Sequence, residues 1–241
     1  MRRRRSVVAP SLLPRALDKI AAFLLIAPII LFSMVAHEYA HGYAALREGD
    51  PTAYQLGRLT LNPLRHIDPF MTVILPLITF FTWGFAFGGA KPVPVVPRNY
   101  RNYKRGDIIV SLAGVATNLA LAIACTLLLI AAGVVGHRVP AAVEWLRLFQ
   151  VMMISGIFFN LLLFIFNLLP IPPLDGSHVV KYLLPPAWAL QYQRVGRYGL
   201  LLVFLVVFFA EGLWLRPVLG LFQFAMQWAN PFLLGRLTGL T

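Results

Sequence analysis

Long uninterrupted apolar runs constrain this chain more than any other feature. Apolar residues dominate positions 20–45, 108–135, 146–169 and 199–212, and a weaker run covers 67–87. A helix needs about 20 consecutive apolar residues to cross the core of a bilayer. A soluble domain of 241 residues could not bury four such runs. The sequence therefore predicts an all-α, polytopic transmembrane helix bundle.

The charge distribution agrees with a membrane protein. Only 12% of the residues are charged, against about 25% in soluble domains. The net charge of +12 comes from basic residues in the loops between apolar runs, around 98–105 and 181–197. That placement is typical of cytoplasmic loops under the positive-inside rule. We therefore expect a lipid bilayer as the surroundings and no nucleic-acid partner.

Stop signals divide the apolar runs into helices. Gly49 and Pro51 follow the first helix, and Pro170 begins a proline-rich sequence after a later one. Proline lacks the backbone donor and clashes with the preceding turn, so a helix must break there. The expected helices cover 17–46, 107–135 and 143–169, followed by a shorter helix at 176–184, a span near 197–213 and an interfacial or short membrane helix from 217 onward.

Two segments between the first and second core helices are expected to differ from long helices. The alternation over Gln55–Leu61 predicts a short β-like strand. The run 67–87 is expected to be a re-entrant or short membrane element. No repeat and no appended soluble domain is visible in the sequence. The expected organisation is a basic tail, residues 1–17, and one membrane-embedded domain, residues 18–241.

Two histidines four residues apart lie in the last third of the first predicted helix, in the sequence His37-Glu38-Tyr39-Ala40-His41. Residues at i and i+4 share a helix face, so both imidazoles can reach one Zn²⁺. In this zincin pattern the intervening glutamate acts as the general base toward a water molecule that the metal activates. Ionisable residues are costly within a membrane helix, which favours a functional site. The alternative is a polar packing patch without metal.

Asp175 is the candidate for a third ligand. A catalytic zinc needs three protein ligands and an open position. Asp175 follows the proline break, and Gly176 permits a close approach of the backbone. Its alternative role is the N-cap of the next helix. Combined with a two-histidine motif that lacks a third ligand, Asp175 is favoured as a metal ligand, and the sequence predicts one zinc per chain.

The combination of these segments resembles the site-2 protease family of intramembrane zinc proteases. The resemblance is to its compact bacterial members and covers roughly residues 20–184. Its motifs are HEYAH at 37–41 and NLLPIPPLDG at 167–176, with Gly57–Pro63, His66–Pro69, Ala90–Pro94, and Ser111–Gly114 followed by Asn118. Two positions depart from the family pattern: Val115 replaces a proline, and Met71 lies where glycine is commoner.

The resemblance implies a role for each matched residue. It assigns His37, His41 and Asp175 as zinc ligands, Glu38 as the catalytic base and Asn167 as a polar group near the substrate or oxyanion. The implied activity is that of a zinc metalloendopeptidase, which hydrolyses peptide bonds in or near transmembrane segments of protein or peptide substrates. The alternative function is a non-enzymatic membrane protein that binds or transports zinc. Such a protein would not need a carboxylate placed to deprotonate water.

The proposed ligands also predict a topology. If His41 and Asp175 bind one metal, their two helices must end on the same side of the membrane. The basic loops at 91–105 and 181–197 belong in the cytoplasm, so the active site is expected near the cytoplasmic face of the cell membrane. This topology places Arg2–Arg5 outside, against the same rule.

Several other polar residues are given structural roles. Asn118 and Asn160 lie in predicted membrane helices, where an amide usually bonds to a neighbouring helix. His66 is expected at the membrane interface. His178 is expected to be structural rather than a ligand, although it lies only three residues after Asp175.

Overall fold

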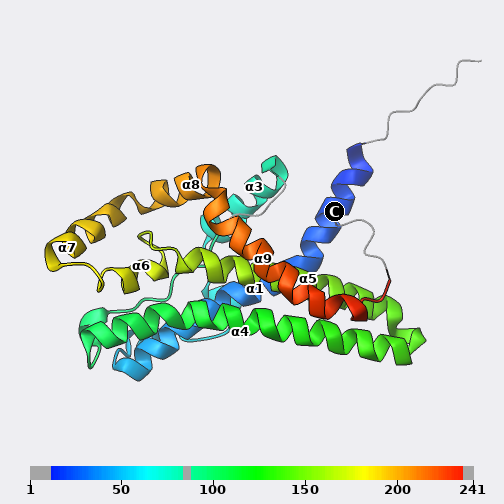
Figure 1. Ribbon diagram of the computed structural model, residues 1–241, viewed down its shortest axis with the longest axis horizontal. Helices are drawn as coiled ribbons and strands as arrows, with labels where there is room; N and C mark the ends of the chain where they lie inside the picture. The colour runs from blue at the N-terminus through cyan, green and yellow to red at the C-terminus, as the bar shows by residue number, and fades with distance from the viewer. Residues whose placement is uncertain (1–11, 84–87, 236–241) are drawn as a thin grey trace, which may run out of the picture.

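A computed structural model describes residues 12–83 and 88–235, and within those ranges every regular element is a helix (Figure 1). The frame consists of α1 (Leu12–Glu48), α4 (Tyr103–Arg138) and α5 (Val143–Leu168). Each contains a stretch long and apolar enough to cross a membrane. The predicted helical membrane bundle is confirmed. Residues 1–11, most of the predicted basic tail, lie outside the described residues.

The α4–α5 hairpin is the centre of the molecule. The two helices are joined by the short turn Pro140–Ala142 and therefore run antiparallel. Their core contains small and large apolar side chains from both helices and from α9: Ala122, Cys125, Leu129, Met153, Ile157, Leu161, Val218 and Ala229. Gly156 lies close to Cys125, and small residues of this kind let membrane helices approach each other.

The predicted β-like strand over Gln55–Leu61 is wrong. Gln55 instead ends the short helix α2 (Thr52–Gln55), and no strand occurs in the described ranges. Gly57 adopts a φ of 62°, which turns the chain sharply after α2. The amides of Arg58 and Leu59 both bond back to the Ala53 carbonyl. Because these backbone groups are satisfied locally, the alternation of side chains does not produce a strand.

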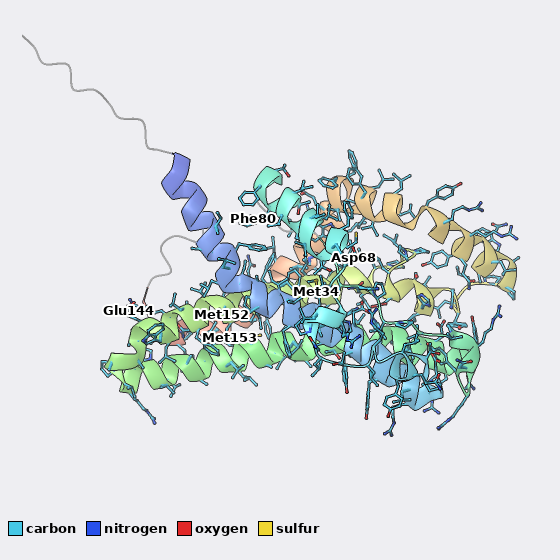
Figure 2. All side chains as sticks on the ribbon, turned by 180° about the vertical axis from the view of Figure 1, so that it is seen from behind. Met34, Asp68, Phe80, Glu144, Met152 and Met153 are labelled. Carbon is cyan, nitrogen blue, oxygen red and sulfur yellow. The ribbon has the colours of Figure 1, made fainter. Side chains whose placement is uncertain are left out.

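The predicted short membrane element is present between α1 and α4. It consists of a π-helix, Pro69–Ile74, continued by α3 (Leu75–Trp83). The apolar helix is too short to cross a core of about 30 Å. The Asp68 carboxylate caps it by accepting from the amides of Phe70 and Met71. Its far end leans on α1, where the rings of Phe80 and Phe23 are 5.3 Å apart (Figure 2).

After α5 the chain forms more and shorter helices than its hydropathy predicts. It contains α6 (Asp175–Val180), α7 (Pro186–Val195), α8 (Gly199–Phe209) and α9 (Glu211–Ala229). The predicted span near 197–213 ends at Ala210, whose backbone leaves the helical region at φ −127°. A new helix begins at Glu211, where a carboxylate favours a helix start. Helix α9 then crosses over α5 (Figure 1).

Asp50 ties the end of α1 to the loop that leads into α4. It is fully buried, and its carboxylate accepts from the Thr52 hydroxyl, the Asn99 side chain and the Val96 amide. Burial alone would raise the pKa of Asp50, but these hydrogen bonds outweigh it and lower the pKa below its usual value. The C-terminal end of α1 and the N-terminal end of α4 therefore lie together.

Candidate metal centre

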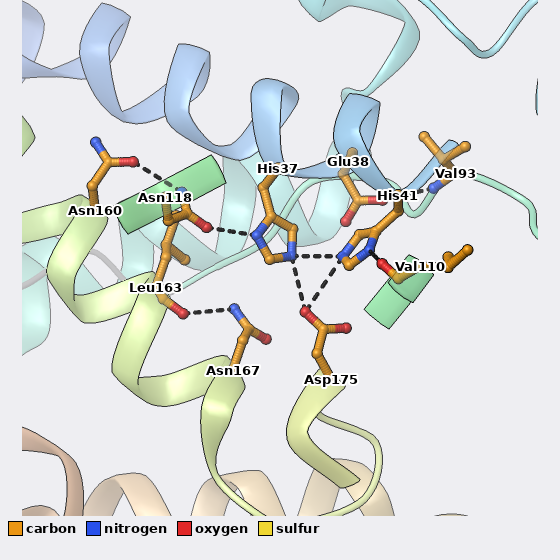
Figure 3. Close-up of polar contacts among 10 residues, drawn as sticks. All are labelled: His37, Glu38, His41, Val93, Val110, Asn118, Asn160, Leu163, Asn167 and Asp175. Carbon is orange, nitrogen blue, oxygen red and sulfur yellow. Dashed lines mark hydrogen bonds and ion pairs between the residues drawn. The ribbon is translucent and has the colours of Figure 1, made fainter. Parts of the chain in front are cut away.

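The two histidines of α1 point toward one another from successive turns. Their Nε2 atoms are 2.9 Å apart, and the rings meet nearly edge to face (Figure 3). The i, i+4 spacing places both on the helix face that packs against α4 and α5. His37 is buried, and His41 is only partly accessible. The sequence prediction that both imidazoles converge is confirmed.

Asp175 completes a three-residue cluster. Its Oδ2 lies 3.3 Å from Nε2 of His37 and 3.3 Å from Nε2 of His41. It is the first residue of α6, and the N-cap is Leu174, so the alternative of Asp175 as a helix N-cap does not hold. Gly176 lies tight against the Leu168 carbonyl oxygen, where a Cβ would clash. This contact folds the chain back onto the end of α5 and directs Asp175 toward the histidines.

The other ring nitrogen of each histidine faces an oxygen. His41 Nδ1 is 2.7 Å from the Val110 carbonyl oxygen, and His37 Nδ1 is 2.6 Å from the Asn118 side-chain oxygen. Neither oxygen can donate, so each Nδ1 carries a hydrogen. In the neutral rings both Nε2 atoms then present lone pairs to the shared space.

The cluster has the chemistry of a metal site. The two Nε2 lone pairs and a carboxylate oxygen lie within 4.8 Å of one another, and the Asp175 Oδ2 is a buried oxygen with no hydrogen-bond partner within residues 12–83 and 88–235. Three converging electron-pair donors repel one another unless a cation lies between them. A proton can satisfy two of them, whereas a divalent metal can satisfy all three. Two histidines and a carboxylate are a donor set that suits zinc.

Helix α4 leaves space for the cluster at Gly114. A Cβ at this position would lie 2.5 Å from His41 Nε2 and 2.6 Å from His37 Cε1. Contacts this short are excluded for any side chain. Gly114 therefore lets α4 pack directly against the two imidazoles.

Glu38 lies beside the ligands without joining them. Its Oε2 accepts a hydrogen bond of 2.7 Å from the amide of Val93, in the proline-rich segment before α4 (Figure 3). It is not a member of the three-ligand cluster. The hydrogen bond fixes one carboxylate oxygen, and Oε1 has no recorded hydrogen bond to another described residue.

Asn167 lies in the last turn of α5, on the same broken helix end that leads to Asp175. Its amide nitrogen donates to the Leu163 carbonyl at 3.0 Å (Figure 3). Its side-chain oxygen accepts no hydrogen bond from the described residues. The role of Asn167 near the substrate remains a prediction.

The sequence analysis missed Asp107. This buried carboxylate on α4 binds three side chains of the segment after Asp175: His178 Nδ1 at 3.1 Å, the Tyr182 hydroxyl at 2.9 Å and the Lys181 ammonium. The expectation that His178 has a structural role fits these contacts. A carboxylate at the start of an otherwise apolar run was the available signal for Asp107.

His66 lies outside the three-residue cluster. It is fully buried by protein, and its Nε2 bonds to the Thr60 carbonyl at 2.8 Å. The Lys91 amide in turn donates to the His66 carbonyl. Its expected position at the membrane interface stays a prediction.

Comparison with known proteins agrees with this site. The model for peptidase family M50 matches residues 131–210, which include Asp175. "Putative zinc metalloprotease YwhC" of Bacillus subtilis is 41% identical over 195 residues, which cover 77% of this chain and 80% of that protein. The chain belongs to peptidase family M50. "Putative zinc metalloprotease Rip2" of Mycolicibacterium smegmatis is 33% identical over 78% of this chain and 68% of its own length.

Membership of family M50 confirms the resemblance to site-2 proteases. The match of the family model does not reach His37 and His41, whose place in the site rests on the three-residue cluster. The predicted zinc cofactor is borne out by the family and by the three-ligand geometry. No solved structure matches this M50 peptidase.

Proposed function

We propose that this chain is an intramembrane zinc endopeptidase that hydrolyses peptide bonds in or near transmembrane segments of membrane proteins. The observation that carries the proposal is the convergence of His37, His41 and Asp175 beside a carboxylate that is not itself a ligand. Three ligands with a separate general base are what a hydrolytic zinc site requires. The names of the relatives agree with this reaction class.

Different residues of the site have different roles in hydrolysis. His37, His41 and Asp175 would hold the zinc, which when bound activates water and polarises a carbonyl as a Lewis acid. Glu38 accepts the proton of the attacking water at Oε1 and returns it to the leaving amine. The amide of Val93 holds the opposite oxygen of Glu38, which limits rotation of the carboxylate between the two transfers.

The position of the cluster suggests the substrate class and the membrane face. His37 and His41 lie in the last third of α1, and Asp175 begins α6 shortly after the end of α5. The basic loop before α4 adjoins them through the contact between Val93 and Glu38. Basic loops favour the cytoplasmic side, so we place the site near that face. A substrate helix would have to unwind there, because a helical carbonyl is already hydrogen-bonded.

A Glu38→Gln variant tests the catalytic assignment. Glutamine keeps the size of the side chain and can still accept from Val93, but it cannot take up a proton at neutral pH. We expect near-normal zinc content and folding, with cleavage of a transmembrane peptide reduced by about 10²–10⁴-fold. Zinc is measured by elemental analysis of the purified protein, and cleavage by electrophoresis and mass spectrometry.

Ligand variants provide the contrast. Alanine at His37, His41 or Asp175 should remove most of the zinc, and with it the activity, whereas the wild-type chain should hold about one zinc. Wild-type cleavage rates in Glu38→Gln would contradict the general-base role. Zinc movement across vesicles without proteolysis in any form would support a transporter instead. Full zinc content in Asp175→Ala would remove that residue from the ligand set.

A further inference from the structure

A buried chain of side-chain hydrogen bonds begins at His37 and runs away from the metal centre. His37 Nδ1 is 2.6 Å from the Asn118 oxygen, and the Asn118 amide donates to the Asn160 oxygen at 2.9 Å. The Asn160 amide then donates to the Ser33 hydroxyl at 2.8 Å and to the Gly156 carbonyl at 2.9 Å. Asn118, Asn160 and Ser33 are each 0% exposed. The chain joins α1, α4 and α5 (Figure 3).

The far end of this chain determines its direction. The Gly156 carbonyl can only accept, so the nitrogen of Asn160 must face it and the oxygen of Asn160 must face Asn118. Asn118 must therefore donate to Asn160 and turn its own oxygen to His37. An oxygen facing Nδ1 requires a hydrogen on that nitrogen. The backbone of α5 thus sets the orientation of two amides in series.

The Ser33 hydroxyl also fixes the orientation of the Asn160 amide. Its hydroxyl donates to the Ile29 carbonyl at 2.7 Å, so its oxygen is left as an acceptor for the Asn160 amide. Both hydrogens on the Asn160 nitrogen are then used. A flip of the Asn160 amide would set its oxygen against the Gly156 carbonyl, and at this fully buried position bulk solvent could not supply another partner.

We propose that Asn118 and Asn160 are positioning residues that hold His37 in the Nδ1–H form, so that its Nε2 lone pair always faces the metal centre. This role deepens the proposed function and rests on it. Histidine ligands commonly depend on a partner for their second nitrogen. Here that partner is oriented by a carbonyl two side chains away, on α5. The role expected for both asparagines was packing between helices. The same hydrogen bonds that serve this packing also orient His37.

Two variants at Asn160 separate orientation from packing. Asn160→Ala removes the acceptor that fixes Asn118, which can then rotate its amide and present a donor to His37. Asn160→Asp still accepts from Asn118, and in its protonated form it keeps one donor in place of the two amide hydrogens that face Ser33 and Gly156. We expect zinc affinity to fall about 10–100-fold in Asn160→Ala and to stay near the wild-type value in Asn160→Asp. The hydrogen bonds of Asn160 within the described residues go to Asn118, Ser33 and Gly156, so the substituted residue does not itself bond to a presumed metal ligand.

Zinc affinity is measured on full-length protein in detergent by competition with a chromophoric chelator. The absorption spectrum of the Co²⁺-loaded protein gives a second readout that does not depend on activity, and it should change in Asn160→Ala alone. Gln150→Ala is the control, because Gln150 is also a buried amide on α5 but, among the residues that the structure describes, bonds only to Leu129, Phe232 and Leu234. It should lower thermal stability without changing zinc affinity.

The outcomes are distinct. Equal zinc affinity in folded Asn160→Ala and wild type would overturn the proposal, and so would equal losses in the alanine and aspartate variants. If Asn160→Ala does not fold, Asn118→Leu against Asn118→Asp makes the same comparison, because only aspartate keeps an oxygen facing His37. A wild-type chain that binds no zinc would overturn the metal centre itself, and with it the proposed function.

Discussion

Gly114 of α4 shows that the site depends on the absence of a side chain at this position. The imidazoles of His37 and His41 occupy the space that a Cβ of this residue would take. The backbone conformation does not require a glycine at this position, because the residue lies within α4 and its φ is not positive. It is needed for contact between α4 and the ligands.

We expect Gly114→Ala to weaken zinc binding by at least about tenfold, because either the ligands or α4 must move. Zinc retention after dialysis against a chelator measures this effect. Gly220→Ala is the control, since Gly220 lies in α9 with nothing near its Cβ position. That change should leave zinc binding unaltered and stabilise the helix by up to about 1 kcal/mol. Equal zinc retention in both variants would show that the packing at position 114 can relax.

At the scale of elements, the short helix α6 is positioned from both of its ends. Gly176 packs against the last turn of α5, and Lys181 and Tyr182 bind Asp107 on α4. Burial and the hydrogen bond to Asp107 raise the pKa of Tyr182, so its hydroxyl remains a donor. Asp175 therefore reaches the histidines from a helix that is attached to the same α4 that packs against them.

Asp107→Asn should loosen this attachment. The buried Lys181, which is only 9% exposed, would lose its counter-charge, and removing one partner of a buried ion pair costs about 3–5 kcal/mol. We expect a lower thermal unfolding temperature and weaker zinc binding through displacement of Asp175. Glu48→Gln is the matched control, because Glu48 pairs with the well-exposed Arg105. Unchanged zinc affinity in Asp107→Asn would show that Gly176 alone positions Asp175.

At the scale of the whole molecule, the cluster of His37, His41 and Asp175 relates the directions of the three frame helices to one another. Helices α1 and α5 both run toward the ligands, and α4 runs away from them. The basic loop before α4 therefore lies on the side of the site, and the α4–α5 turn lies on the opposite side. The bent pair Pro186–Tyr198 and Leu201–Phe209, at 81° to each other, adds a fourth crossing if it counts as one broken span.

Cysteine labelling tests this topology. Cys125, the single cysteine, is 4% exposed and can be changed to alanine first. Val96→Cys then marks the basic loop, and Val139→Cys marks the α4–α5 turn; both side chains are exposed. An impermeant maleimide should label position 139 strongly in intact cells and position 96 only in inverted vesicles, because basic loops favour the cytoplasm. The reverse pattern would move the site to the outer face.

Much of this protein followed from local sequence. The length of the apolar runs determined the membrane bundle, because nothing but a helix satisfies its backbone in lipid over such lengths. The spacing of His37 and His41 determined a shared face, since helical geometry is independent of the surroundings. The proline break before Asp175 likewise predicted a turn at the end of α5. Each of these inferences uses interactions within a few residues.

The tertiary structure decided what depends on distant partners. The alternation at Gln55–Leu61 is compatible with a strand, but the local turn at Gly57 and the absence of a neighbouring strand in the described residues leave it irregular. Asp107 holds α6 through His178 and Tyr182, which lie 71 and 75 positions further along the sequence. His37 and Asn118, which are also in contact, are 81 positions apart. No local pattern encodes such pairs. They arise because buried polar groups must find partners wherever the packed helices place them.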